Sequence, residues 1–266
     1  MIRKLTEKDR SSVLEYLYQD PDFNIFLIGD IEAFGFNRDF QKVYGEFDDQ
    51  GRYLGVYIKY RSNALYYSHL KRFNEAFLDI MFSDPFDFMS GKSDLMALIY
   101  PHLKGFRHRT MFFCSAHTME NDDPINEDSI RVVSTREECG KLYDLLANIE
   151  EFGTRKIERD IYIEDRMIGL GMGVILYIDH QGTIISTAAT TAETTKNAMV
   201  VAVATKEEYR KQGYGSTLVK ALMDLYINQK KKSLCLFYDN EEAGRIYKRL
   251  GFKDIGFWDM CDRIVG

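Results

Sequence analysis

The segment Val201–Ser216 constrains the fold more than any other part of this chain. A continuous apolar run, Ala198–Ala204, leads into a charged turn, and Gly213 and Gly215 then precede a helical pattern. A continuous apolar run is typical of a strand that is covered on both faces. This order predicts a buried strand followed, after a glycine-containing turn, by the start of a helix.

The turn itself favours an anion-binding site. The first backbone N–H groups of a helix have no partner within the helix, and they carry partial positive charge. Gly213 and Gly215 leave the approach to such groups clear of side chains. A dinucleotide-binding turn would need a third small residue and a different strand context. We therefore predict a phosphate cradle at Arg210–Ser216, although two glycines alone also fit an ordinary tight strand-to-helix connection.

A second pattern lies downstream. The strand-like run Leu234–Tyr238 leads to Asn240, and a helical pattern then ends at Gly251. Asn240 stands where a helix start needs a cap, so capping alone explains it. Tyr247 lies seven residues further on, two turns along the same face, where an ordinary core tyrosine is also expected.

Together the two patterns resemble the GNAT superfamily of acyl-CoA N-acyltransferases. The family motif Arg/Gln-x-x-Gly-x-Gly/Ala matches Arg210, Gly213 and Gly215, and the helix motif Asn-x-x-Ala-x-x-x-Tyr-x-x-x-Gly-Phe matches Asn240, Ala243, Tyr247, Gly251 and Phe252. The resemblance runs from about Ile130 to Phe257. It implies an α/β (α+β) fold, in which a twisted, mostly antiparallel mixed sheet is flanked by helices and splayed open for acetyl-CoA.

The resemblance also implies roles for single residues. Pantetheine would bond to the backbone of Val201, Ala202 and Val203 like an added strand. The pyrophosphate would lie on the cradle, whose cofactor-binding residues are Arg210, Lys211, Gln212, Gly213, Tyr214, Gly215 and Ser216. Asn240 would bond the pantetheine arm, while Tyr247 would lie by the thioester and protonate the departing thiolate. Acetyl-CoA is thus implied as the co-substrate, with no metal ion.

The acceptor amine needs a base. An alkyl amine has a pKa near ~10.4, so only about one molecule in a thousand is neutral near pH 7.4. Some family members use a glutamate five residues before the asparagine, but Cys235 occupies that position here. Glu193, which ends the preceding strand, is our candidate for a catalytic or substrate-binding carboxylate. A solvated turn glutamate is the alternative interpretation.

The chain opens twice in the same way. Ile2–Asp9 and Ile130–Glu137 each read as a short strand and a turn before an amphipathic helix. Thr135 and Glu138 fit a capping box at the start of the second helix. Such a repeated opening predicts two tandem units of similar size.

The acidic segment 119–129 separates these units, because it contains Asp-Pro and has little to bury. The spacing in this segment does not fit a calcium-binding EF-hand loop. We therefore predict a first domain at 1–118 and an acetyltransferase domain at 130–266. The first unit lacks both motifs of the second, so we expect a degenerate GNAT-like domain there.

Charge and composition narrow the classes of partner. The net charge of −6 gives no electrostatic reason to expect nucleic acid or an anionic membrane. The four cysteines are widely spaced, which favours reduced thiols over a disulfide framework. The spacing between cysteines and histidines matches no common zinc-binding pattern. The longest apolar stretch is far shorter than the ~20 residues of a membrane span. We expect a soluble, cytoplasmic protein.

The sequence predicts an N-acetyltransferase that moves an acetyl group to the amine of a small molecule or peptide by direct attack on the thioester. An acyl-CoA-binding sensor or scaffold without turnover is the alternative, because the usual strand glutamate is missing. A nucleotide-binding protein is a third interpretation. The resemblance places acceptor specificity at about Glu151–Lys156 and in the first unit, but neither the acceptor nor the oligomeric state follows from the sequence.

Overall fold

The computed structural model describes residues 1–119, 129–149 and 157–264. Residues 120–128 of the predicted linker, where a calcium loop was considered, and the acceptor loop at Glu151–Lys156 lie outside the described residues. The chain divides into two compact units, which are described separately below.

The last strand of the chain belongs to the first unit. This unit comprises Met1–Cys114, Phe237–Asp239 and Asp254–Gly266, and the second comprises Ser115–Leu236 and Asn240–Lys253. The division differs from the predicted one, which kept the whole C-terminal half together. The reason is β12 (Lys253–Arg263), which pairs antiparallel with β5 (Phe88–Lys92) and so completes the sheet of the first unit.

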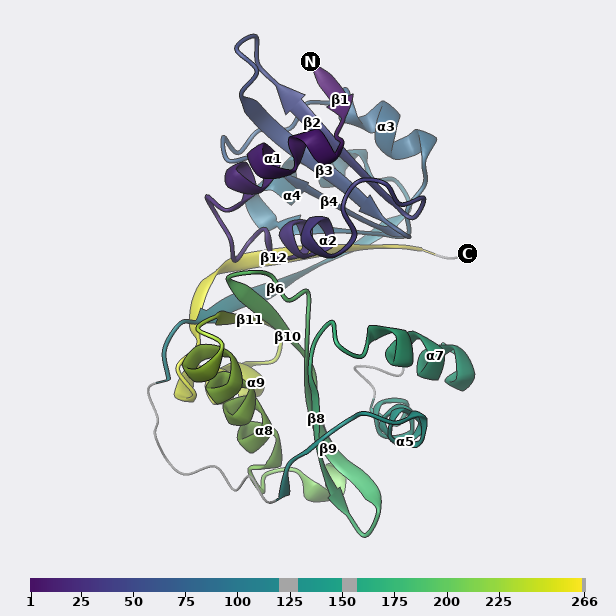
Figure 1. Ribbon diagram of the computed structural model, residues 1–266, viewed down its shortest axis with the longest axis vertical. Helices are drawn as coiled ribbons and strands as arrows, with labels where there is room; N and C mark the ends of the chain where they lie inside the picture. The colour runs from purple at the N-terminus through teal and green to yellow at the C-terminus, as the bar shows by residue number, and fades with distance from the viewer. Residues whose placement is uncertain (120–128, 150–156, 265–266) are drawn as a thin grey trace. The chain divides into compact units, whose positions relative to one another are not determined.

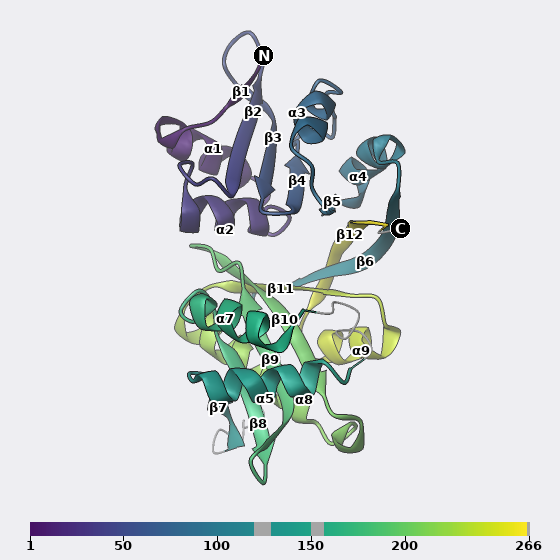
Figure 2. The ribbon, with the colours of Figure 1, turned by 90° about the vertical axis from the view of Figure 1, so that its right-hand side faces the viewer.

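The first unit is a mostly antiparallel sheet between two pairs of helices. Its strands lie in the order β1-β2-β3-β4-β5-β12-β6. Figures 1 and 2 show α1 and α2 on one face, and α3 and α4 on the other. The remaining elements are β1 (Ile2–Lys4), η1 (Glu7–Asp9), α1 (Arg10–Leu17), α2 (Ile25–Phe34), β2 (Gln41–Phe47), β3 (Tyr53–Tyr60), β4 (Asn63–Tyr67), α3 (Phe77–Ser83), α4 (Ser93–Ile99), η2 (Tyr100–His102) and β6 (Phe106–Ala116).

The second unit has the same kind of layering. Its strands lie in the order β11-β10-β9-β8-β7, with α5 and α7 on one face and α8 on the other (Figure 1). Its elements are β7 (Arg131–Val132), α5 (Arg136–Leu146), α7 (Arg159–Gly169), β8 (Ile175–His180), β9 (Thr183–Thr191), β10 (Asn197–Thr205), η4 (Glu207–Tyr209), α8 (Tyr214–Met223), the π-helical η5 (Asp224–Gln229), β11 (Ser233–Tyr238) and α9 (Glu241–Arg249).

Local sequence signals explain how the second unit begins. The Thr135 hydroxyl accepts a hydrogen bond from the Glu138 backbone N–H at 3.2 Å, and the Glu138 carboxylate accepts one from Thr135 N–H at 2.9 Å. The predicted capping box is therefore confirmed. The apolar stripe of α5, including Leu142 and Leu145, is buried against α7 and the sheet, so it forms the core on that face.

The two units repeat one element order, as the duplicated opening predicts. In each, three antiparallel connections are followed by one parallel pair, β4 with β5 and β10 with β11. The parallel pair spans three residue pairs in both units. The predicted fold class, two GNAT-like α/β units with twisted, mostly antiparallel sheets, is confirmed by this architecture.

Candidate functional site

The sheet of the second unit opens beside β10. This strand pairs with β11 only from Asn197↔Ser233 to Met199↔Cys235, although it continues to Thr205. Its N-terminal part is buried, whereas Val201–Val203 are partly exposed. A strand whose ladder groups lack a neighbour on one side can accept an extended ligand as an added strand. The expected opening of the sheet beside this strand is therefore present.

A β-bulge lies within the open stretch. The register with β9 shifts between Val201↔Ala189 and Ala204↔Thr187, and Ala202 has a φ of 53°. A bulge breaks the alternation of the ladder and re-aims the backbone groups that it contains. Positive φ costs a non-glycine residue free energy, and such strained residues cluster at functional sites. The bulge therefore marks Val201–Ala204 as the part of β10 shaped for something other than pairing.

The turn after β10 is held to the end of the strand. The backbone N–H of Lys206 donates to Ile185 O at 2.9 Å, and the Arg210 guanidinium donates to Thr205 O at 3.2 Å. The Gln212 side-chain amide donates to Glu208 O at 3.3 Å. The arginine of the family motif thus fixes the geometry of the turn, a role that its spacing alone did not reveal.

Gly213 begins α8 in a left-handed conformation. Its φ is 86° and that of Lys211 is 62°, and no side chain caps the helix. A β-carbon at Gly213 would meet no atom within 4 Å, and one at Gly215 would lie 3.4 Å from the Thr205 hydroxyl. Position 213 therefore favours glycine because of its left-handed backbone conformation, and not because neighbouring atoms leave no room for a side chain. The space at this helix start is open, as an approaching anion would need.

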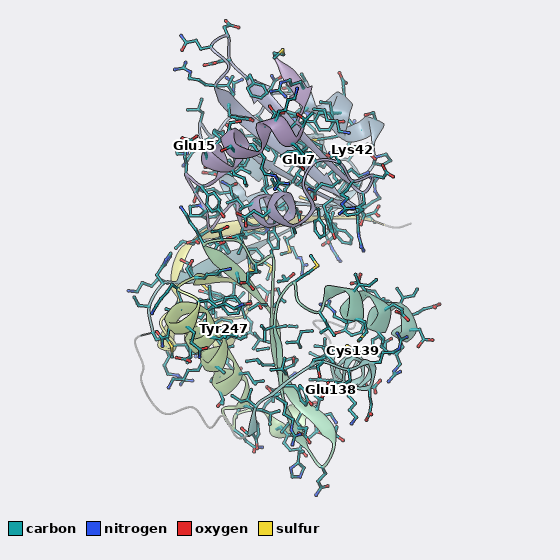
Figure 3. All side chains as sticks on the ribbon, in the orientation of Figure 1. Glu7, Glu15, Lys42, Glu138, Cys139 and Tyr247 are labelled. Carbon is teal, nitrogen blue, oxygen red and sulfur yellow. The ribbon has the colours of Figure 1, made fainter. Side chains whose placement is uncertain are left out.

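Asn240 and Tyr247 lie on α9. The Asn240 side-chain oxygen accepts from Glu242 N–H at 2.8 Å, so the capping interpretation is confirmed. Tyr247 is buried, with its ring 6.0 Å from that of Phe252. Figure 3 shows Tyr247 on the α9 side of the sheet, opposite the α5 residues Glu138 and Cys139. Capping uses only the oxygen of Asn240 and leaves its amide nitrogen to another partner.

Glu193 lies at the other end of β10 from the cradle. The residue precedes the start of β10 at Asn197, whereas the cradle follows its end, so the nine-residue strand of roughly 30 Å separates them. Its carboxylate accepts hydrogen bonds from the Lys232 ammonium at 2.6 Å and from the Tyr226 hydroxyl at 2.8 Å. Lys230 donates a third at 3.0 Å.

These contacts set the charge state of Glu193. Burial raises its pKa, but the hydrogen bonds from Lys232, Tyr226 and Lys230 outweigh burial and leave the pKa below its ordinary value. A carboxylate with a lowered pKa is a weaker base. The observed contacts favour a structural role for Glu193, and its catalytic role stays a prediction.

Sequence reasoning missed the partners of Glu193. Tyr226 is fully buried in the π-helical segment, and its hydroxyl also lies 2.8 Å from that of Thr190. Lys230 lies over the Tyr226 ring at 4.2 Å. No periodicity predicts a π-helix, so nothing in the sequence placed these side chains together. Cys235, at the position of the family glutamate, is buried, is not part of a disulfide and lies at the last residue pair of β10 with β11.

In the first unit, the loop at the position equivalent to the cradle binds a carboxylate of the protein itself. It joins β4 to α3, and in it Arg72 and Asn74 both donate to the carboxylate of Glu46, which is buried in β2. An internal anion thus satisfies the polar groups of this loop. That the first unit has no cofactor cradle stays a prediction.

A comparison with protein families finds a match in the C-terminal half of the chain. The profile of the acetyltransferase (GNAT) family matches residues 141–252, which include β10, the cradle and α9. The chain carries a GNAT domain. A search of curated proteins found no match.

Solved structures extend the GNAT fold to nearly the whole chain. A tandem GNAT protein from the clavulanic acid biosynthesis pathway is similar over 98% of this chain and 97% of its own, with a TM-score of 0.64 and 11% identity. A GCN5-related N-acetyltransferase from Sphaerobacter thermophilus has a TM-score of 0.60 at 13% identity, covering 98% and 94% of the two chains. A GCN5-related N-acetyltransferase-like protein from Streptococcus suis has a TM-score of 0.58 at 16% identity, and the similarity covers 97% of this chain and 99% of that protein.

The described residues were also searched for metal and membrane sites. They contain no group of three or more histidine, cysteine, aspartate or glutamate side chains that could hold a metal ion. The helices in this part of the chain are all too short or too polar to cross a bilayer.

Proposed function

We propose that the GNAT domain binds acetyl-CoA in the opening beside β10 and transfers the acetyl group to an amine. One combination of features carries this proposal. The strand β10 pairs with β11 over only three residue pairs, it contains a bulge at Ala202, and it is followed by the start of α8, which no side chain caps. An elongated thioester with a diphosphate fits these features in that order.

Each part of the cofactor has a partner in this proposal. The pantetheine arm bonds to the backbone of Val201, Ala202 and Val203, and the Asn240 amide nitrogen donates to it. The pyrophosphate accepts hydrogen bonds from N–H groups of the cradle, from Lys211 to Ser216. Each charge-assisted hydrogen bond contributes roughly 1.5–3 kcal/mol. Three or four of them support about micromolar affinity after the cost of association.

The reaction in this proposal is a direct displacement. The lone pair of the neutral amine attacks the thioester carbonyl carbon, and the carbon–sulfur bond breaks. Tyr247 gives its phenolic proton to the departing sulfur and recovers one from the nitrogen of the new amide. The bulge at Ala202 aims backbone donors at the position where the carbonyl oxygen gains charge.

The alternative function is binding of acyl-CoA without transfer of the acyl group. Glu193 is engaged by two lysines, and Cys235 replaces the usual strand glutamate, so the second unit lacks an evident base at either predicted position. This observation favours an acyl-CoA-binding sensor or scaffold as the alternative. Only the enzyme transfers the acetyl group to an acceptor, whether a small molecule or a peptide amine. Acetyl transfer to such an amine therefore separates the two functions.

Calorimetric titration and a thiol-release assay test the proposal together. We expect acetyl-CoA to bind with about micromolar affinity, and ATP and NAD, the control ligands, to bind far more weakly. Thiol release should then depend on one class within a panel of alkyl, amino-acid and peptide amines. Absence of acetyl-CoA binding would overturn the cofactor assignment. Binding without thiol release, for every amine in the panel, would leave only the sensor.

A further inference from the structure

A charged residue lies on the inner face of α7 in the second unit. Arg166 follows Tyr162 by four residues and Ile163 by three, so it shares a helix face with both. Those two side chains are buried in the core of the unit, and Arg166 itself is half-buried. In contrast, Ile161 and Ile168 on the outer face are 59% and 73% exposed. Packing alone would favour an isoleucine inside and the arginine outside, so Arg166 needs another explanation.

No carboxylate among the described residues forms an ion pair with Arg166. The other arginines of α5 and α7 each have one, because Arg159 pairs with Asp144 at 3.2 Å and Arg136 pairs with Glu164. A guanidinium is always charged in a protein, so it cannot avoid the cost of burial by losing a proton. A half-buried cation without a counter-ion is therefore poised to receive an anion.

The immediate surroundings of Arg166 are aromatic and apolar. Its guanidinium carbon lies 5.1 Å from the centre of the Tyr162 ring. The thiol of Cys139 on α5 is also near, since burial raises the pKa of this thiol and the charge of Arg166 opposes the rise. The Nε atom of Arg166 is buried, and it has no hydrogen-bond partner in the described part of the chain. Stacking on a ring attracts the cation, but it leaves this N–H group without an acceptor.

The core around Arg166 extends to the open part of β10. Val201 and Ala202 pack against the cluster that contains Tyr162 and Cys139. These two residues of β10 belong to the stretch proposed to bond to pantetheine, which ends in the thioester. Because α5, α7 and β10 are all parts of the second unit, this arrangement lies within one unit. An acceptor on the α7 side of β10 is therefore among the neighbours of Arg166.

A single guanidinium beside a ring favours a carboxylate over a phosphate. Its planar fork of N–H donors matches the two oxygens of a carboxylate, which accept parallel hydrogen bonds. A phosphate group carries more charge and would need a second cation, but the neighbouring Arg136 and Arg159 are already paired with acids. The diphosphate of the cofactor has its own place in the proposed function, at the cradle. The carboxylate therefore belongs to the acceptor.

We infer that the acceptor is an amine that also carries a carboxylate, and that Arg166 binds this carboxylate. The inference rests on the proposed function and names the substrate class, which is amino acids and peptides with a free C-terminus. Arg166 is a specificity-determining residue in this scheme, because it positions the acceptor and exchanges no proton. The amine nitrogen attacks the thioester as proposed above, so the products are an N-acetyl amino acid or peptide and free CoA.

Matched pairs of acceptors test the inference in the thiol-release assay. Each pair is an amino carboxylic acid and its carboxamide, compared at equal concentrations of neutral amine, and the acids are glycine, phenylalanine, β-alanine and glycylglycine. We expect the acid of at least one pair to have a kcat/KM at least tenfold higher, because a carboxamide cannot accept the charge-assisted hydrogen bonds. Acetyl transfer with equal kcat/KM for acid and carboxamide in every pair would overturn the inference.

Arg166→Gln should remove the preference for the acid. We expect the ratio of the two kcat/KM values to fall within about twofold of one, while acetyl-CoA affinity stays unchanged. Arg166→Lys keeps the charge without the planar fork, so its ratio should be intermediate. Arg159→Gln is the matched control on the same helix and should keep the wild-type ratio, because Arg159 already has an acid partner. A preference that survives in folded Arg166→Gln protein would contradict the inference.

Calorimetric titration distinguishes failure of the inference from failure of the proposed function. The four acids and their carboxamides are titrated into the protein with and without CoA, which carries no acetyl group to transfer. We expect the acid of the preferred pair to bind at least tenfold more tightly than its carboxamide, and this difference to be lost in Arg166→Gln. Such binding without thiol release would support the carboxylate site and contradict acetyl transfer. Equal affinities in every pair would refute the carboxylate site, even if acetyl transfer is observed.

Discussion

The guanidinium of Arg210 donates a hydrogen bond of 3.2 Å to the carbonyl oxygen of Thr205, the last residue of β10. The arginine that marks the family motif therefore acts on its own backbone. It ties the turn to the strand, so that the N–H groups at the start of α8 keep a fixed direction relative to the open edge of β10. Arg210 itself is exposed, so this role concerns geometry more than stability.

Replacing Arg210 by alanine should weaken cofactor binding without unfolding the domain. We expect acetyl-CoA affinity to fall about 5- to 30-fold, roughly 1–2 kcal/mol, since the loss of one charge-assisted hydrogen bond frees the turn. Calorimetry measures the affinity, and thermal unfolding should shift by no more than a few degrees. Lys211→Ala is the control, because the Lys211 side chain makes no comparable bond to β10. An equal loss in both variants would point to charge and not to the position of the turn.

Two substitutions at Gly213 separate backbone strain from occupancy of the cradle. Gly213→Val should destabilise the fold by about 1–2 kcal/mol, because a β-branched residue is strained at a φ of 86°. Gly213→Asn should fold almost normally, because asparagine tolerates the left-handed region. Its side chain would nonetheless enter the space proposed for the diphosphate, so acetyl-CoA affinity should fall at least tenfold. Full affinity in a folded Gly213→Asn protein would contradict the cradle.

Tyr247→Phe tests the proton donor. We expect kcat in the thiol-release assay to fall about 10- to 100-fold, because the departing thiolate loses its acid. Acetyl-CoA affinity should stay within about twofold. Tyr209→Phe removes a hydroxyl from η4, outside the cradle residues, and is the control, with kcat expected to be unchanged. Wild-type kcat in Tyr247→Phe would exclude this phenol as the acid.

Glu193→Gln tests whether that carboxylate is structural. The lowered pKa of Glu193 means that its ion pairs stabilise the fold above the ordinary pKa and are lost as pH falls through the folded value. We therefore expect Glu193→Gln to lower the free energy of unfolding by about 1–2 kcal/mol at pH 7, and by less near pH 4. Thermal unfolding at both pH values measures this. A strong loss of kcat with unchanged stability would instead support the predicted catalytic role.

Much of the second unit follows from local sequence signals. Thr135 and Glu138 specify where α5 begins, and glycine at 213 specifies where α8 begins, because each signal acts over a few residues. The strands β10 and β11 begin and end within about one residue of the apolar runs that predicted them, since those runs are bounded by turns.

The rest depends on contacts between distant parts of the chain. Pairing of β12 with β5 joins residues more than 160 positions apart, and no local pattern reports such a pairing. The helix predicted after Gly215 ends its α-helical part at Met223 and continues as a π-helix, in which the Tyr226 hydroxyl donates to Glu193.

Asp30 should cost the protein stability in a pH-dependent way. Its pKa rises from an ordinary value of 3.8 to about 7 on folding, so between these values the folded state holds the extra proton. The free energy of unfolding therefore falls as pH rises through this window. Above pH 7 the full cost is about 4 kcal/mol, at 1.36 kcal/mol for each pKa step. Asp30→Asn removes the charge, so it should raise Tm by several degrees at pH 8 and by less at pH 5.

Differential scanning fluorimetry at the two pH values checks this, with Glu32→Gln as the control that should show no such trend. If Asp30→Asn were destabilising at pH 8, the carboxylate would have a stabilising partner in the folded protein, and the expected pH trend would be wrong.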